Sequence, residues 1–180
     1  MKNIFALVLI SSFLFAPNVF ANKSDIKEKK EESNKVIKLS VGLKAPNFSA
    51  KTQDGKNVKL SDFKGKNSVL LVFYPGDNTP VCTKQLCDIR DDYKGLEKKG
   101  IKVFGINQAD EKSHKDFIKD QKLPFSLIID EKLEISKNYD AMGAFGFINR
   151  TVVLINKEGK IVLYERGTPD VSAKKIKNLI

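Results

Sequence analysis

The feature that most constrains the fold is an unbroken apolar run at residues 68–74, which ends at Pro75. A strand with one wet face would alternate apolar and polar residues, so a continuous short run is typical of a strand that is covered on both faces. The sequence therefore predicts the central strand of a layered α/β fold. A chain of 180 residues with 41% hydrophobic residues can bury one such core, which excludes a disordered chain.

The rest of the chain alternates between β-rich and helical segments. The runs at residues 48–52 and 57–60 flank Asp54-Gly55, a dipeptide that is typical of a β-hairpin turn. Further strands are predicted at 101–106, 125–129, 151–155 and 160–164, and helices at 80–98, 113–121, 133–139 and 171–180. This order predicts a mixed central sheet flanked by helices, with an N-terminal hairpin.

The N-terminus is predicted to precede the folded domain. Residues 1–21 have the pattern of a signal peptide: Lys2 comes before an apolar stretch too short to span a membrane, and cleavage is expected after Ala21. We therefore expect an exported, periplasmic protein without stable membrane association after cleavage, in a compartment where disulfides persist. Residues 22–40 are rich in charge and lack aromatic side chains, which predicts a flexible linker, and residues 41–180 form the domain.

The charge and the metal-ligating residues limit the classes of function. Lys and Arg outnumber Asp and Glu by 32 to 22, but the cations are almost all lysines, which disfavours a nucleic-acid groove. A basic module that binds polyanionic surfaces stays open as an alternative. Two cysteines and one histidine offer too few ligands for a structural zinc site, so no metal or cofactor is expected.

The candidate chemistry begins at the N-terminus of the helix predicted over 80–98. Thr79 is predicted as the N-cap and Pro80 as the first helical residue, since both types favour these positions. Cys82 then falls in the first turn, where the helix dipole favours a thiolate, the nucleophilic form of cysteine. The alternative is a small buried hydrophobic residue that happens to lie at a helix start.

The spacing of Cys82 and Cys87 restricts how the two can react. In an α-helix, residues five apart are rotated by about 140° and their Cα atoms lie about 8.6 Å apart. Disulfides tolerate Cα separations of up to about 7 Å. A bridge between the two cysteines therefore requires local unwinding, which predicts a helical dithiol and a locally unfolded disulfide. A permanent structural disulfide is the alternative.

The motif Pro75-x-x-x-Thr79-x-x-Cys82 resembles the active-site signature of the peroxiredoxins. Its surroundings, residues 73–87, are similar to the bacterioferritin comigratory, or Q-type, branch of these thiol peroxidases. The resemblance extends over residues 41–180. Its other matches, in order, are Gly42-x-x-Ala45-Pro46-x-Phe48, Asp54-Gly55, Asp110 with Ser113-His114-x-x-Phe117, and Arg150-Thr151-x-x-x-Ile155-x-x-x-Gly159.

The resemblance implies a thioredoxin fold and a thioredoxin-dependent hydroperoxide reductase. It implies that Cys82 is the peroxidatic cysteine and Cys87 the resolving cysteine of a redox-active disulfide. Thr79, Pro75 and Arg150 complete the pocket. The implied substrates are hydrogen peroxide and organic hydroperoxides, the implied reductant is a thioredoxin-like dithiol, and the protein is a monomer or homodimer that binds no nucleic acid. An exported thiol–disulfide carrier is the alternative function.

Four further side chains lie in or near these motifs. Gln85 stands where the family commonly has glutamate. His114 is expected to be a capping or surface residue rather than a catalyst. Phe145 and Phe147 are expected to pack in the core, although they lie close enough in sequence to Arg150 to line an entrance.

Overall fold

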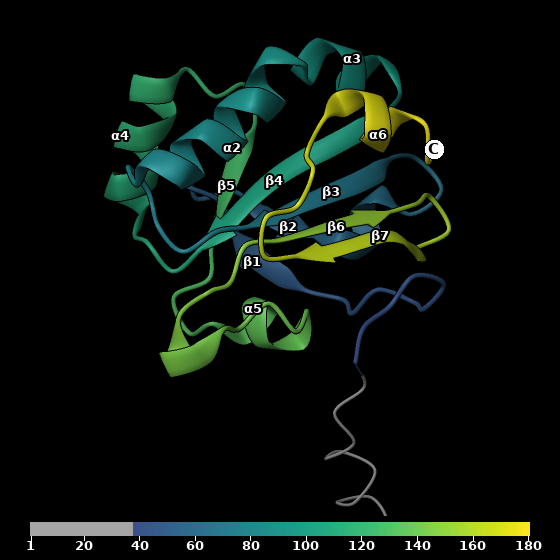
Figure 1. The fold of residues 1–180 in the computed structure, drawn as a ribbon, viewed down its shortest axis with the longest axis horizontal. Helices are drawn as coiled ribbons and strands as arrows, with labels where there is room; N and C mark the ends of the chain where they lie inside the picture. Colours follow the sequence, from purple (N-terminus) through teal and green to yellow (C-terminus); the bar gives the residue numbers. More distant parts are fainter. Residues whose placement is uncertain (1–37) are drawn as a thin grey trace, which may run out of the picture. The chain divides into compact units, whose positions relative to one another are not determined.

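The computed structural model describes residues 38–180, shown as a ribbon in Figure 1. The signal peptide predicted at 1–21 and most of the linker predicted at 22–40 lie outside the described residues. Leu39, within the predicted linker, is buried against the core. Between residues 38 and 180, no helix is both long and apolar enough to cross a membrane.

A five-stranded mixed sheet forms the centre, in the order β5-β4-β3-β6-β7. Its strands are β3 (Ser68–Phe73), β4 (Ile101–Asn107), β5 (Ser126–Ile129), β6 (Thr151–Ile155) and β7 (Ile161–Arg166). The neighbours β3, β4 and β5 are parallel, whereas β6 is antiparallel to both β3 and β7. Every residue of β3 is buried, which confirms the central strand predicted from the apolar run.

The predicted hairpin is also confirmed. It consists of β1 (Ser49–Lys51) and β2 (Asn57–Lys59), paired antiparallel, and Gly55 in the turn adopts a φ of +72°, which glycine reaches without strain. The helices are α2 (Pro80–Asp91), α3 (Tyr93–Lys98), α4 (Glu111–Gln121), α5 (Glu134–Asn138) and α6 (Ala173–Lys177), with short 3-10 turns η1 (Leu60–Phe63) and η2 (Ala144–Gly146).

The sheet separates two clusters of buried apolar side chains. Helices α2, α3, α4 and α6 cover one face, and the hairpin, η1 and α5 cover the other. Successive strand residues point to opposite faces, so Leu70 and Val72 join the first cluster while Leu71 and Phe73 join the second. Both faces of the sheet are thus covered by other elements, so a functional site is expected at the ends of the strands.

The single helix predicted over residues 80–98 is wrong, because the structure breaks it at Asp92. This residue has φ −99° and ψ 3°, between the end of α2 and the start of α3. Aspartate is a poor helix-interior residue, and Gly95 lowers the helix propensity of the second half further. The break lets α3 pack on β4 and α6.

Gly105 in β4 allows close packing of Leu127 and Tyr74 against the strand. A Cβ placed there would lie 2.5 Å from Leu127 Cδ2 and 3.1 Å from Tyr74 Cε1, and both side chains are fully buried. We expect Gly105→Ala to lower the free energy of unfolding by about 1–3 kcal/mol, because the packed neighbours must shift. Urea unfolding measures this change. Gly76→Ala is the control, since a Cβ at Gly76 meets no atom within 4 Å. Equal stability of Gly105→Ala and the wild type would contradict the prediction.

Candidate active site

Two of the residues singled out from the sequence, Pro75 and Arg150, lie at the same end of the neighbouring strands β3 and β6. Pro75 follows the end of β3, and Arg150 precedes the start of β6. Because β3 and β6 are antiparallel, with Phe73 paired to Thr151, the end of one strand lies beside the start of the other. The structure therefore places Pro75, Arg150 and the start of α2 around the same end of β3.

Helix α2 begins where the sequence predicts. Thr79 has extended backbone angles, φ −89° and ψ 136°, as a residue before proline prefers, and its carbonyl accepts the first helical hydrogen bond from Thr83 N at 2.8 Å. The Thr79 hydroxyl makes no capping bond within the described part of the chain. It donates instead to the Gly76 carbonyl at 3.4 Å. Thr79 is an exposed residue at the helix start.

The two cysteines lie on this one unbroken helix. Cys82 is the third residue of α2, in the turn whose backbone N–H groups have no intrahelical acceptor; its side chain lies outside what the structure describes. Cys87 is a partly buried free thiol. It donates a hydrogen bond to Gln121 Oε1, at the end of α4, with an Sγ to Oε1 distance of 3.5 Å.

A cavity of about 130 Å³ lies between the first turns of α2 and Arg150. Gln85 lines it and is 7% exposed, yet neither polar atom of its amide has a hydrogen-bond partner among residues 38–180. The other lining residues are Val81, Lys84, Asp88, Thr168, Pro169 and Val171. The cavity surface is thus mostly apolar and opens beside the candidate cysteine turn, and its polar lining includes the cations Lys84 and Arg150, the carboxylate of Asp88 and the buried amide of Gln85.

Asp77 is the organising residue of this edge, and the sequence reasoning missed it. Its side chain is 3% exposed and accepts four hydrogen bonds. Tyr74 Oη donates to Oδ1 at 2.7 Å and Asn107 Nδ2 to the same oxygen at 2.9 Å. Ser113 Oγ donates to Oδ2 at 2.7 Å, and His114 Nδ1 lies 3.0 Å from that oxygen. The carboxylate therefore ties the loop before α2 to the end of β4 and the start of α4.

The charge state of Asp77 follows from these contacts. Burial raises the pKa of Asp77, but the hydrogen bonds from His114 and Ser113, the attraction of His114 and the hydrogen bond from Tyr74 outweigh burial, so the pKa lies below its ordinary value. The second ring nitrogen of His114, Nε2, lies 3.3 Å from the carbonyl of Ile128, which is also an acceptor. Only the imidazolium form of His114 donates to both.

Three expectations for nearby residues are wrong. His114 is fully buried rather than a surface residue, and the cap of α4 is Asp110, whose carboxylate accepts from Ser113 N at 2.8 Å. Phe145 is 96% exposed and Phe147 63% exposed, so neither packs in the core. Both lie in or next to η2, where Phe145 adopts a φ of +59° that turns the chain outward.

The position of Asp77 carried a signal that could have identified it. It lies four residues after the end of β3, a buried strand that is parallel to its neighbour β4, and polar residues near the carboxyl ends of parallel strands converge. The apolar run before it also ends in Tyr74, whose hydroxyl needs a partner when the ring is buried. Neither feature identifies Ser113 or His114 as partners of Asp77, because these two residues belong to helix α4.

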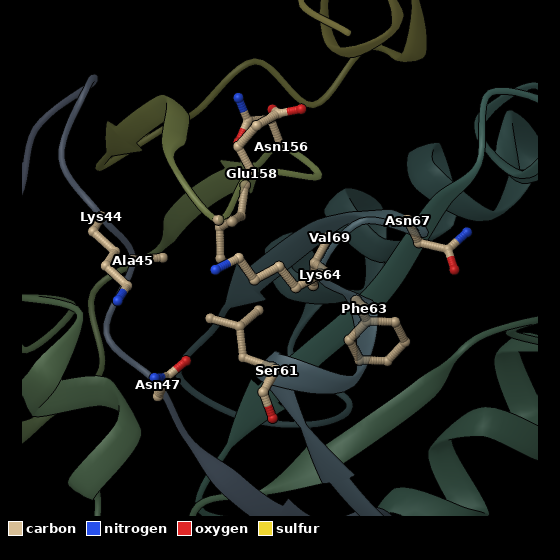
Figure 2. A pocket seen from close by; sticks show the side chains of 13 residues that line it. Lys44, Ala45, Asn47, Ser61, Phe63, Lys64, Asn67, Val69, Asn156 and Glu158 are labelled. Carbon is tan, nitrogen blue, oxygen red and sulfur yellow. The ribbon is translucent and has the colours of Figure 1, made fainter.

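A second cavity, of about 180 Å³, lies away from this site (Figure 2). It is lined by Val69 and Ile155, which are paired at the opposite ends of β3 and β6 from Pro75 and Arg150. Lys44 and Lys64 are among its polar residues, in the view of Figure 2. The length of the strand pair therefore separates it from the cysteine helix.

Comparison with known proteins gives consistent matches. The AhpC/TSA family model matches residues 41–164. Peroxiredoxin Q, chloroplastic, of Triticum aestivum is 45% identical over 126 residues, which cover 69% of this chain and 58% of the wheat protein. The protein named peroxiredoxin bcp in Coxiella burnetii is 40% identical over 132 residues, covering 69% of this chain and 87% of that protein. The match thus spans less than two thirds of the wheat protein's length.

The fold also matches solved structures. A cysteine-to-serine mutant of Xylella fastidiosa PrxQ superposes with a TM-score of 0.70 at 24% identity, over 78% of this chain and 94% of that chain. The reduced 2-Cys peroxiredoxin of Plasmodium vivax gives a TM-score of 0.70 at 25% identity, over the same two shares. These likenesses confirm the predicted thioredoxin fold.

The relatives contradict the predicted periplasmic location. Those from Triticum aestivum, Oryza sativa and Suaeda salsa are chloroplastic proteins. The physical reason for the error is that export signals and organellar transit peptides are both poor in acidic residues near the N-terminus. The first acidic residue of this chain is Asp25, and a lack of acidic residues does not by itself separate the two kinds of address.

Proposed function

This chain belongs to the AhpC/TSA family, and from that premise we propose that it is a peroxiredoxin that reduces hydrogen peroxide and organic hydroperoxides. We place the catalytic domain at residues 41–180. The peroxidatic residue is Cys82 and the resolving residue is Cys87. A thioredoxin-like dithiol returns the resulting disulfide to two thiols, and no cofactor takes part.

The first step is attack of the Cys82 thiolate on one peroxide oxygen. The O–O bond breaks, an S–O bond forms, and the departing oxygen takes a proton and leaves as water or an alcohol. Negative charge develops on that oxygen, so nearby hydrogen-bond donors lower the barrier. Thr79 and Arg150 are the proposed donors, and Pro75 shields the sulfur from bulk water. The mostly apolar cavity beside Arg150 is suited to the organic part of a hydroperoxide.

The second step joins the two cysteines. The Cys87 thiolate attacks the sulfur of the Cys82 sulfenic acid, an S–S bond forms, and hydroxide leaves and is protonated to water. Both cysteines belong to one chain, so this step needs no second subunit. Helix α2 must unwind for it, since residues five apart in a helix are about 8.6 Å apart and a disulfide spans at most about 7 Å.

One observation carries the proposal: Cys82 lies in the first turn of α2, three residues after Thr79, and Arg150 lies at the end of β3 from which the chain leads to this turn. The helix N-terminus favours thiolate at Cys82, and the strand pairing brings a cation to the same place. A thiol–disulfide carrier would use the closer Cys-x-x-Cys spacing, which closes without unwinding. The experiment must therefore distinguish a peroxidase from a thiol–disulfide carrier.

Stopped-flow oxidation of the reduced protein by hydrogen peroxide and by an organic hydroperoxide tests the proposal. We expect a second-order rate constant at least about a thousandfold above that of a free thiol, corresponding to about 4 kcal/mol of barrier lowering by the proposed donors and the thiolate. A rate like that of a free thiol, together with rapid exchange with a disulfide substrate, would identify a thiol–disulfide carrier instead.

A further inference from the structure

The end of helix α4 holds the turn of α2 that carries Cys87. Gln121, the last residue of α4, contacts this turn twice. Its side-chain Oε1 accepts from the Cys87 thiol, with Sγ 3.5 Å away, and its backbone carbonyl accepts from Arg90 Nη1 at 2.7 Å. Gln121 is therefore linked to two residues of α2, Cys87 and Arg90, which lie about one helical turn apart.

Each contact has a clear physical origin. The last carbonyls of a helix lack intrahelical donors, and a cation there is favoured by the helix dipole, so the Arg90 guanidinium is suited to the carbonyl of Gln121. The same guanidinium donates from Nε to Asp91 Oδ1 at 2.8 Å, which fixes its orientation. Hydrogen bonding to Asp91 and attraction to Cys87 are among the causes that raise the pKa of Arg90.

The hydrogen bond from Cys87 exists in only one redox state. A thiol has a proton to donate, whereas a disulfide sulfur has none. An interaction made in the dithiol and lost in the disulfide stabilises the dithiol relative to the disulfide. Closing the bridge also requires α2 to unwind, so contacts that fix the Cys87 turn to α4 oppose closure.

We propose that Gln121 is a positioning residue that sets the redox balance of the Cys82–Cys87 pair, and that Arg90 acts through it by holding its backbone. The inference rests on the proposed disulfide between these two cysteines. Gln121 stabilises the reduced, helical form of α2. It therefore slows closure of the bridge and makes the closed disulfide easier for a donor dithiol to reduce.

The test is equilibration of the full chain with reduced and oxidised glutathione, scored by counting free thiols. In this reaction the two thiols become one disulfide while glutathione disulfide becomes two glutathione thiols, so no peroxide is needed. We expect Gln121→Ala to raise the equilibrium constant for disulfide formation by about fivefold, the value of one modest hydrogen bond, or about 20 mV towards a more negative potential. Gln121→Glu should shift it the opposite way, since a carboxylate is the stronger acceptor for the thiol.

Two further variants separate positioning from general destabilisation. Arg90→Ala should shift the equilibrium in the same direction as Gln121→Ala, with faster amide hydrogen exchange in α2. Asp120→Ala is the matched control, because Asp120 is exposed on the same turn of α4 and should leave the equilibrium unchanged. Unchanged equilibria in both Gln121 variants, or shifts of the same sign, would overturn the proposal. Slow reaction with peroxide would refute the peroxidase function alone, since the glutathione equilibrium is measured without peroxide.

Discussion

Cys82→Ser is expected to abolish peroxide reduction, lowering the second-order rate constant by about a thousandfold or more. Removing the nucleophile of a covalent mechanism removes the whole reaction path rather than one contribution to it. Serine keeps the size of the side chain but is not ionised at neutral pH, so the helix N-terminus has no anion to favour. Stopped-flow mixing of the reduced variant with hydrogen peroxide, followed by thiol counting, measures the loss.

Cys87→Ser is the matched variant from the same helix. It should keep the fast first oxidation, because the first step uses only Cys82. The product should then proceed from sulfenic to sulfinic acid as peroxide is raised, and turnover with a donor dithiol should stop. Mass spectrometry of the variant after oxidation identifies these products. Fast oxidation of Cys82→Ser would show that Cys87 is the peroxidatic residue instead. A thiol that peroxide leaves unoxidised in Cys87→Ser would show that Cys82 is not peroxidatic.

Asp77→Asn is expected to lower the free energy of unfolding at neutral pH by about 3 kcal/mol or more. The carboxylate is buried and accepts four hydrogen bonds, and removing its charge leaves His114 without its partner. An asparagine amide also turns one acceptor into a donor that faces other donors. Urea unfolding near pH 7 measures the difference between the variant and the wild type.

The difference in the free energy of unfolding between the wild type and Asp77→Asn should become smaller at acidic pH. The pKa of Asp77 is lowered in the folded protein, so its stabilisation is fully present above the unfolded-state pKa of about 3.9 and is lost as the pH falls through the folded-state value. The stability gap between the wild type and Asp77→Asn should therefore narrow below about pH 4.

Two controls separate this effect from general changes in charge. Asp116→Asn removes an exposed carboxylate of α4 that pairs with Lys112, and it should leave the stability nearly unchanged because solvent screens this pair. Ser113→Ala removes one of the four donors to Asp77 and should cost about 1 kcal/mol. A constant gap between Asp77→Asn and the wild type from pH 7 to pH 3 would show that the charge of Asp77 does not stabilise the fold.

The sequence predicted the parts of the fold that depend on local pattern. The strand at 68–74 and the hairpin at Asp54-Gly55 are encoded by hydrophobic pattern and turn chemistry, and both are found. The start of α2 at Pro80 follows from the fixed backbone of proline and the residue before it. These features need no knowledge of distant neighbours.

The features that were missed depend on tertiary contacts. Asp77 looks like an ordinary loop aspartate, because its donors come from the end of β4 and the start of α4. The buried environment of His114 has the same origin, since its ring meets a loop on one side and β5 on the other. The break at Asp92 reflects packing of α3 on α6 as much as local propensity.

The antiparallel pairing of β3 with β6 also determines when the site exists during synthesis. Phe73 and Thr151 are paired although they lie far apart in the chain, so the turn with Cys82 emerges from the ribosome well before Arg150 does. Pairing between distant segments is a late event in folding. A nascent chain therefore carries its cysteine helix without the cation that completes the proposed site. The proposed site is therefore complete only once β6 has paired with β3.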